Sequence, residues 1–447
     1  MLLFHSMCGL WQFRRTSLRS CLLFAFMASV YCHGQLTMHD CGEAGEPVRC
    51  GTLRVAENQS IPDGRHLDLS IVVVPRTGNK VKEPLFILKG GPGETATTDV
   101  EDTISLFRPV RAEHDLVLLD QRGTGATRLR CEVADRAFLV PLDPKSCLAR
   151  LQARADLRFY TTEHFVDDLD AARAALGYEQ ISLWGASYGT RVAYEYARRH
   201  TARVRSLVLV APAPLSMPLL DVFGEDGQAS LDALAADCAV DSRCSKAFPA
   251  VRADVRRLHE SLTGRFDRIG LQMLLYSSAT ARQIPFLASR AAAGDRAPFT
   301  SAIEQMRYQL VPRLSLGLHL AVLCSEDLPF HVTTASPQPD SFLKAEYDVA
   351  CQGWPQAELP ADFHTPIPVN KPALLITGEW DPATPPRWAR VAADQFSRNQ
   401  LVIVPKEGHM LARINECIGI MTRDFLERGN ADPSCALRLK PLPYQLQ

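Results

Sequence analysis

Two kinds of hydrophobic pattern alternate along the first half of the chain. Short runs rich in valine, isoleucine and leucine are typical of strands buried on both faces, and longer segments carry apolar residues at helical spacing. We expect such strands over residues 67–74, 84–89, 115–120, 181–184 and 204–210. Because helices connect consecutive parallel strands, the alternation predicts an α/β fold with a mostly parallel central sheet flanked by helices.

Helical spacing is clearest on either side of the fourth of these strands. The segment 163–176 ends at Gly177, a typical residue at a helix end, and its apolar residues share one face: Phe165, Val166, Leu169, Ala172 and Leu176. A second helix is expected over 187–200. This part of the chain therefore predicts a strand, a tight turn, a helix and another strand in succession.

The pattern changes after Pro214. Residues 221–363 are rich in alanine and arginine and show helical periodicity, and strand-like runs return only at 372–377 and 401–404. At 447 residues the chain is longer than one hydrophobic core usually grows. We expect a core interrupted by a helical cap, with core parts over 35–215 and 366–447, the second ending in a helix and tail, and the cap over 216–365.

Residues 1–34 have the three-part layout of a secretory signal. Arg14, Arg15 and Arg19 precede an apolar run over 21–31, and small or polar residues follow it. The run is too short to span a bilayer comfortably. We expect signal removal, no stable membrane insertion afterwards, and export to a periplasm or out of the cell. An N-terminal membrane anchor or a misassigned start is the alternative.

Cysteine spacing points to an oxidising destination. Of the 13 cysteines, three lie in the expected signal. The other ten fall into five pairs of cysteines that are close together in the sequence. Behind an export signal this indicates disulfides, for which we expect sequential pairing. Metal ligation is the alternative, but the chain has no Cys-x-x-Cys pair and no His-Glu-x-x-His helix, so no metal site is expected. The expected pairs are Cys41 with Cys50, Cys131 with Cys147, Cys238 with Cys244, Cys324 with Cys351, and Cys417 with Cys435.

Composition argues against a disordered chain and against nucleic-acid binding. Apolar residues make up 46% and charged residues 22% of the chain, which is ordinary for a soluble globular protein and unlike a disordered one. Lysine and arginine number 49 against 50 aspartate and glutamate, for a formal charge of -1. Without a basic excess to hold phosphate backbones, we expect no nucleic-acid partner.

A glycine-flanked serine lies between the strand expected at 181–184 and the helix after it. The segment Gly185-Ala186-Ser187-Tyr188-Gly189 has glycine two residues before and two residues after Ser187. Such glycines leave room for a strained turn that exposes the serine Oγ, as a nucleophile elbow requires. A glycine-rich turn that only packs the helix on the strand is the alternative.

A nucleophilic serine needs a base within hydrogen-bond reach, and the base needs an acid to orient it. His409 follows the last expected strand, and Asp381 follows the strand before it. Glu379 is the competing acid, but Pro382 places Asp381 in a rigid loop rather than at the strand edge. The order Ser187, Asp381, His409, each just beyond a strand end, is the order of the α/β-hydrolase architecture.

The oxyanion formed by acyl transfer needs fixed N–H donors. We expect one from Tyr188, the residue after the nucleophile, and one from the loop Gly90-Gly91-Pro92-Gly93. Because Pro92 has no N–H, Gly91 is the expected donor. An ordinary glycine turn is the alternative for this loop. Acyl transfer of this kind uses no metal or nucleotide, so we expect no cofactor.

These motifs resemble those of the prolyl aminopeptidase and tripeptidyl aminopeptidase group of α/β-hydrolases. The resemblance spans about residues 50 to 425 and rests on the glycine-proline loop, Asp120-Gln121-Arg122-Gly123-Thr124-Gly125, the Ser187 elbow, the Asp381 loop and Gly408-His409. It implies an exported serine peptidase that releases amino acids or short peptides, including tripeptides, from free N-termini, with the helical cap over the site. Where many members have histidine before the glycine loop, this chain has Lys89.

The resemblance also implies a substrate-binding acid. In the group a cap carboxylate commonly holds the substrate ammonium, and Glu326 in Cys324-Ser325-Glu326-Asp327 resembles that element; a solvated acidic turn is the alternative. Arg122 is expected to brace its loop by bonding several carbonyls. An esterase or lipase would use the same triad, and a catalytically silent binding protein the same scaffold. The motifs do not specify the number of residues released, a proline preference or the oligomeric state.

Overall fold

The computed structural model describes residues 35–42, 46–133, 138–330 and 342–447. The secretory signal expected over 1–34 lies outside these residues, so that expectation stays a prediction. Among the residues that are described, no helix is both long enough and apolar enough to cross a bilayer.

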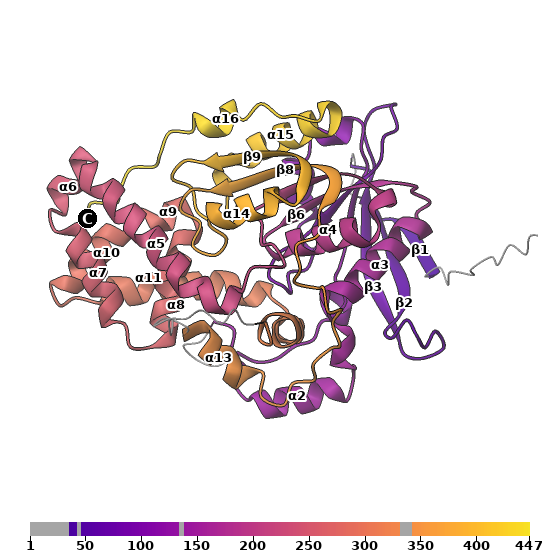
Figure 1. The fold of residues 1–447 in the computed structure, drawn as a ribbon, viewed down its shortest axis with the longest axis horizontal. Coiled ribbons are helices and arrows are strands. Elements are labelled where there is room, and N and C mark those ends of the chain that lie inside the picture. Colours follow the sequence, from indigo (N-terminus) through magenta and orange to yellow (C-terminus); the bar gives the residue numbers. More distant parts are fainter. Residues whose placement is uncertain (1–34, 43–45, 134–137, 331–341) are drawn as a thin grey trace, which may run out of the picture. The chain divides into compact units, whose positions relative to one another are not determined.

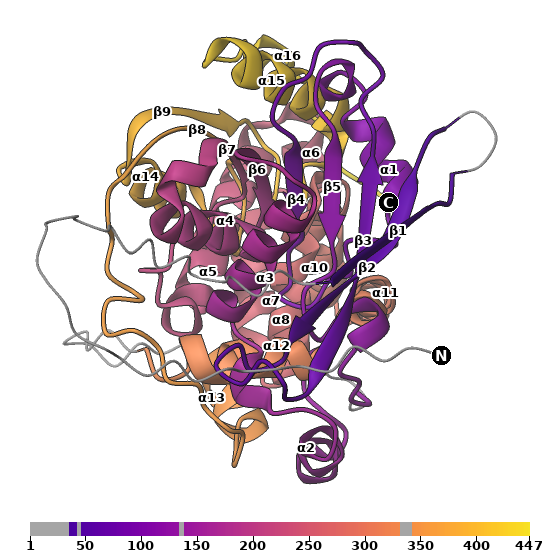
Figure 2. The same ribbon diagram turned by 90° about the vertical axis from the view of Figure 1, so that its right-hand side faces the viewer.

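Nine strands in the described residues form one sheet, in the order β1-β2-β3-β5-β4-β6-β7-β8-β9. Pairing is antiparallel from β1 to β3 and between β3 and β5, and parallel from β5 to β9. Figure 2 shows β1, β2 and β3 side by side in indigo. This sheet confirms the predicted fold class. The strands are β1 (Gln35–Asp40), β2 (Arg49–Ala56), β3 (His66–Val74), β4 (Leu85–Leu88), β5 (Leu116–Leu119), β6 (Ile181–Ala186), β7 (Val204–Val210), β8 (Val369–Gly378) and β9 (Phe396–Val404).

The first two strands of the sheet are not predicted by the hydrophobic pattern. β1 has no buried residue, and in β2 only Leu53 and Val55 are buried. Strands that face solvent lack the continuous apolar run that identifies a strand buried on both faces. The seven expected strands correspond to β3 to β9, of which β8 and β9 begin earlier than expected, at Val369 and Phe396.

Helices cover both faces of the sheet because its inner strands are apolar on both sides. Along β4, Phe86 and Leu88 belong to one hydrophobic cluster and Leu85 and Ile87 to the other, as the alternation of side chains in a strand requires. Helices α3 and α4 contribute to the first cluster, and α1 and α15 to the second. Figure 1 shows α14 against β8 and β9. These helices are α1 (Val100–Leu106), α3 (Thr162–Ala175), α4 (Tyr188–Arg199), α14 (Pro386–Ala393) and α15 (Asn415–Arg428).

The chain between β7 and β8 forms a helical insertion, in the region where we expect the cap. Its described residues contain α5 to α13 and no strand of the sheet. Figure 1 shows α5 to α11 grouped together, coloured from pink to orange. The insertion consists of α5 (Leu219–Val240), α6 (Ser242–Ala247), α7 (Val251–Ser261), α8 (Arg265–Met273), α9 (Ser278–Ala281), α10 (Ile284–Ala292), α11 (Ala297–Leu310), α12 (Leu316–Val322) and α13 (Phe342–Ala350). Outside it lie two further short helices, α2 (Pro144–Gln152) and α16 (Ser434–Leu437).

Five disulfides link the ten cysteines of the described residues, in the sequential pairing that the spacing predicts. The bonds join Cys41 with Cys50, Cys131 with Cys147, Cys238 with Cys244, Cys324 with Cys351, and Cys417 with Cys435. The fourth bond ties the π-helical turn Leu323–Asp327, which continues α12, to the residue that follows α13. The two segments of the insertion that approach the site described below are therefore covalently joined.

Candidate active site

Ser187 lies at the sharp turn between β6 and α4. Its backbone has φ 53°, in the left-handed region that is uncommon for a residue with a side chain, and its N–H donates to the Val210 carbonyl at 2.9 Å. The backbone around this turn packs so closely that both flanking positions must be glycine. A Cβ on Gly185 would collide with the backbone of Gly189, and a Cβ on Gly189 would collide with the backbone of Leu88. The turn therefore has the strained, closely packed geometry of a nucleophile elbow.

Loops after β8 and β9 bring an acid and a base to Ser187. Because the carboxyl ends of parallel strands meet at one edge of a sheet, residues far apart in sequence become neighbours there. His409 Nε2 lies 3.0 Å from Ser187 Oγ. His409 Nδ1 lies 2.8 Å from Asp381 Oδ2 and 3.0 Å from Asp381 Oδ1. The structure thus places the three expected residues in hydrogen-bond contact, in the order serine, histidine, aspartate.

The carboxylate of Asp381 is fully buried and held by several donors. Oδ1 accepts from the backbone N–H of Ala383 at 2.9 Å and of Thr384 at 2.8 Å, and Oδ2 accepts from Thr384 Oγ1 at 2.8 Å. The competing acid, Glu379, is exposed and accepts from the backbone N–H of Lys406 at 2.9 Å. Of the two acids only Asp381 contacts His409.

Asp381 and His409 stabilise each other's charged forms. Burial by itself would raise the pKa of Asp381, but the charge of His409 and the hydrogen bonds to the carboxylate outweigh it and lower that pKa. Burial by itself would lower the pKa of His409, but the charge and hydrogen bond of Asp381 outweigh it and raise that pKa. Asp381 therefore stabilises an imidazolium at His409.

Gly91 and Tyr188 line the same cavity as Ser187. Tyr188 is the first residue of α4, where backbone N–H groups lack partners within the helix. Neither the Gly91 N–H nor the Tyr188 N–H has an acceptor among the described residues. Gly91 has φ +109°, and a Cβ there would press on the backbone of Gly93, so the position requires glycine. Two N–H groups without acceptors beside the serine could bind an oxyanion.

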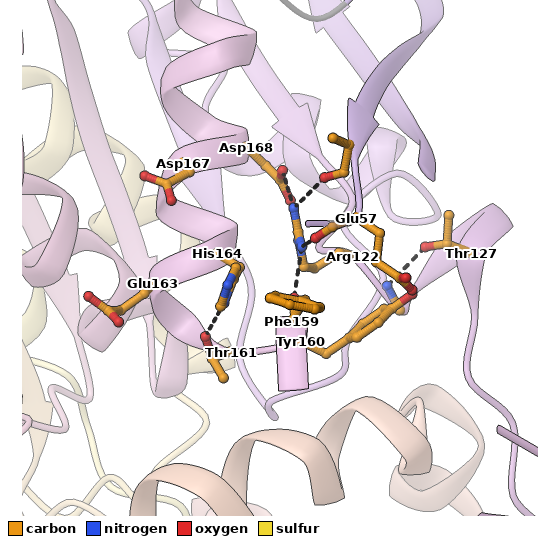
Figure 3. Close-up of polar contacts among 12 residues, drawn as sticks. Glu57, Arg122, Thr127, Phe159, Tyr160, Thr161, Glu163, His164, Asp167 and Asp168 are labelled. Atoms are coloured by element: carbon orange, nitrogen blue, oxygen red, sulfur yellow. Dashed lines mark hydrogen bonds and ion pairs between the residues drawn. The ribbon is translucent and has the colours of Figure 1, made fainter. Parts of the chain in front are cut away.

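Arg122 braces the turn after β5, as its predicted structural role requires. Its guanidinium is fully buried and binds both carboxylate oxygens of Asp168 at 2.7 Å. The same group donates to the carbonyls of Glu57 at 2.8 Å and Phe159 at 2.7 Å. Figure 3 shows Arg122 extending between Asp168 on α3 and the turn at Phe159. It does not line the cavity at Ser187.

A cavity lies beside Ser187, with most of its wall supplied by the helical insertion. The wall is largely apolar and includes Leu219, Phe223, Ile269, Met273, Leu323 and Leu343. Besides Ser187 and Tyr188, the described lining residues with polar side chains are Arg191, Tyr276, His319, Glu346, Tyr347 and Thr384. A mostly apolar pocket with a few polar groups is the usual form of a small-molecule or peptide site.

Glu326 does not lie where the amine-anchor expectation requires. It is fully buried and is not among the residues that line the cavity. One carboxylate oxygen accepts from the Thr162 N–H at 2.6 Å and the other from Thr162 Oγ1 at 2.8 Å, so Glu326 satisfies the first turn of α3. Burial, opposed in part by these hydrogen bonds, raises the pKa of Glu326 to about 8. It is not the solvated acidic turn of the alternative either.

The acid that lines the cavity is Glu346 on α13, which no sequence motif singles out. Its side chain is 7% exposed, and Oε2 has no hydrogen-bond partner among the described residues. Burial raises the pKa of Glu346, and the charge of Arg265 offsets this in part. A buried carboxylate oxygen without a partner is costly unless a donor reaches it. The sequence around Glu346 shows only helical periodicity, which does not distinguish this acid from the other acids of the insertion.

Fold and site together define a class of protein. The sheet edge presents a serine on a strained elbow, a histidine and a buried aspartate in hydrogen-bond series, next to two backbone donors without acceptors. This is the constellation of a serine hydrolase with the α/β-hydrolase architecture. Residues 83–412 match the alpha/beta hydrolase fold family, and the chain belongs to it.

Three proteins that are similar to this chain are named as peptidases or proteases. Serine protease Hip1 of Mycobacterium tuberculosis is 29% identical over 223 residues, 44% of this chain and 42% of Hip1. The "Probable proline iminopeptidase" of Streptomyces coelicolor is 32% identical over 168 residues, 38% of this chain and 41% of that protein. Tripeptidyl aminopeptidase of Streptomyces lividans is 26% identical over 188 residues, 37% of this chain and 35% of that protein. The matches confirm the predicted resemblance, and each spans less than half of the relative's own length.

Proposed function

We propose that this protein is an exported serine peptidase that removes amino acids or short peptides from free N-termini. The observation that carries the proposal is a serine-histidine-aspartate series whose serine opens into a cavity that Glu346 also lines, with one carboxylate oxygen, Oε2, that has no hydrogen-bond partner among the described residues. The similarity to proteins named as peptidases supports it. The five disulfides of the described residues are compatible with an oxidising compartment.

In the proposed reaction Ser187 Oγ attacks the carbonyl carbon of the scissile bond while His409 Nε2 takes the hydroxyl proton. The N–H groups of Gly91 and Tyr188 bind the oxyanion of the tetrahedral intermediate. The bond to the leaving group then breaks, and His409 passes its proton to that group. Water, deprotonated by His409, attacks the acyl-enzyme and releases the product acid and free Ser187. Asp381 orients His409 throughout.

The same proposal assigns the substrate ammonium to Glu346 rather than to Glu326. An ammonium group supplies charge and donors to a carboxylate that has an unpartnered oxygen, and such a pair is stronger inside a cavity than in bulk water. Glu326 already accepts twice from Thr162 and lies outside the cavity. Arg191, a cation that lines the cavity, pairs with Asp327 at 2.8 Å, and Arg265, whose charge acts on Glu346, does not line the cavity.

An esterase is the second candidate, and one observation favours it. The cavity wall is mostly apolar, which suits the acyl chain of an ester as well as an apolar peptide side chain. The triad does not separate the two, because it determines acyl transfer and not the leaving group.

The experiment is hydrolysis by purified protein of aminoacyl, dipeptidyl and tripeptidyl amides with free N-termini, their N-blocked forms, and short-chain esters. Ser187→Ala supplies the blank. For the peptidase, we expect turnover of free-amine amides, with one length preferred and N-blocked forms much slower. Turnover of esters alone would establish the esterase instead.

Two matched substitutions locate the ammonium. Glu346→Gln should lower kcat/KM for free-amine amides about 100-fold, because it removes the charge that a buried ammonium pairs with. Its effect on N-blocked esters should stay within about threefold. Glu326→Gln, the same change at a buried acid outside the cavity, should leave the ratio of free to blocked substrates unchanged. The assignment fails if the two variants give the same ratio.

A further inference from the structure

His319 is a buried histidine at the cavity that the proposed reaction does not use. It lies on α12, is 3% exposed and lines the cavity together with Ser187. Its Nδ1 is 3.1 Å from the carbonyl oxygen of Pro92, in the loop that carries the proposed oxyanion donor Gly91. Its Nε2 is 2.6 Å from the hydroxyl of Tyr347, which is also buried and lies next to Glu346 on α13.

The chemistry of the two partners determines where the protons are. A carbonyl oxygen only accepts, so the Pro92 contact requires a proton on His319 Nδ1. Burial lowers the pKa of His319 to about 4, so the ring is neutral at working pH and Nε2 carries no proton. Nε2 must therefore accept, and the Tyr347 hydroxyl donates to it. The two protons of this series are therefore assigned: Tyr347 donates its hydroxyl proton to His319 Nε2, and His319 Nδ1 donates its proton to the Pro92 carbonyl.

The helical insertion holds the glycine-proline loop at neighbouring points as well. The Gly93 carbonyl accepts from the Ser315 N–H at 2.8 Å, and Glu94 forms a bridge with Leu314. Gly91 and Gly93 both have positive φ, at 109° and 112°, and glycine alone does not hold such a conformation because it has wide backbone freedom. External contacts must therefore hold this loop in its conformation.

We propose that His319 is a positioning residue that holds the Pro92 carbonyl and so keeps the Gly91 N–H aimed at the oxyanion, with Tyr347 fixing the ring from α13. The inference rests on the proposed acyl-transfer function of Ser187. It links the oxyanion loop of the core to the helix of the insertion that carries Glu346. His319 moves no proton in the reaction, since His409 is the residue in contact with Ser187.

Two substitutions separate the two bonds of His319. The amide of His319→Asn lies near the former Nδ1 and can donate to Pro92, but it does not reach Tyr347. The amide of His319→Gln lies near the former Nε2 and can accept from Tyr347, but it does not reach Pro92. Tyr347→Phe removes only the hydroxyl that bonds His319 Nε2, and it keeps the aromatic ring at position 347 and the imidazole of His319.

The readouts are the rate at which a fluorophosphonate acylates Ser187, and kcat and KM on an activated N-blocked ester, with melting temperature as the control for folding. We expect His319→Gln to slow acylation and kcat about 10- to 100-fold with KM nearly unchanged, a smaller effect than losing an oxyanion donor outright. His319→Asn should stay within about threefold of the unsubstituted protein, and Tyr347→Phe should lie between the two.

Equal rates for His319→Asn and His319→Gln would overturn the inference, as would a loss confined to KM. If His319→Gln does not fold, Tyr347→Phe decides, and unchanged kcat in that variant overturns the inference. Failure of the underlying function looks different, because the unsubstituted protein itself would then neither react with the fluorophosphonate at Ser187 nor hydrolyse the ester.

Discussion

Asp381→Asn tests the candidate triad at its most constrained position. Oδ1 of Asp381 accepts two backbone N–H groups, from Ala383 and Thr384, so the single carbonyl oxygen of asparagine must take that place. Its NH2 group then occupies the place of Oδ2, which lies 2.8 Å from Thr384 Oγ1 and 2.8 Å from His409 Nδ1. An NH2 group facing Nδ1 requires Nδ1 to be unprotonated.

The proton of His409 then moves to Nε2, 3.0 Å from Ser187 Oγ, where it donates to the hydroxyl instead of accepting its proton. The same substitution in a protease with this triad lowers kcat about 10⁴-fold, which corresponds to about 5.4 kcal/mol of barrier. We expect a loss of that size. Stability should change little, since asparagine keeps the backbone bonds and its NH2 group can donate to Thr384 Oγ1, which then accepts instead of donating.

The assay is burst-phase acylation by an activated ester, measured across pH with the unsubstituted protein and with Glu379→Gln. Glu379 lies in the same loop, but its side chain is exposed and accepts a hydrogen bond from the backbone N–H of Lys406, so its substitution should change the rate less than threefold. If Asp381→Asn kept its acylation rate within about tenfold, the tautomer argument and the role of Asp381 would both be refuted.

Two further predictions follow from buried charges. The pKa of His409 is raised above 6.5 and the base must be neutral, so kcat/KM should rise with pH through an apparent pKa above 6.5; a limb below 6.5 in the pH profile would contradict this. Arg122→Met leaves the fully buried carboxylate of Asp168 without its partner and should cost about 3–5 kcal/mol in denaturant unfolding. Adding Asp168→Asn should recover part of that loss, and no recovery would show that the charge of Asp168 is not the cause.

Sequence patterns predict the part of the fold that is buried on both faces. Strands β3 to β9 contain apolar runs because helices cover them on two sides, and their order along the chain is enough to place Ser187, Asp381 and His409 at strand ends. β1 and β2 lack that signal because most of their residues remain exposed or half-buried. Their position in the sheet depends on cross-strand pairing, which local patterns do not encode.

The remaining residues at the cavity could not be predicted in the same way. His319, Glu346 and Tyr347 lie on α12 and α13, and helical periodicity alone does not say which face of a helix meets a cavity. His319 lies in an apolar run of leucine, alanine and valine, where a histidine is expected only to be buried. Its contacts with Pro92 and Tyr347 depend on how the insertion packs on the core.

The acidic pair Glu326-Asp327 shows why resemblance to a motif does not by itself locate a substrate-binding acid. The π-helical turn directs both carboxylates into the protein, where Glu326 binds the first turn of α3 and Asp327 pairs with Arg191 on α4 at 2.8 Å. Both acids therefore attach the insertion to the helices beside the nucleophile, and Cys324 ties the same turn to Cys351 after α13. Since both carboxyl groups already have partners, the proposed recognition of a substrate ammonium is assigned to Glu346 on α13, whose Oε2 has no hydrogen-bond partner among the described residues.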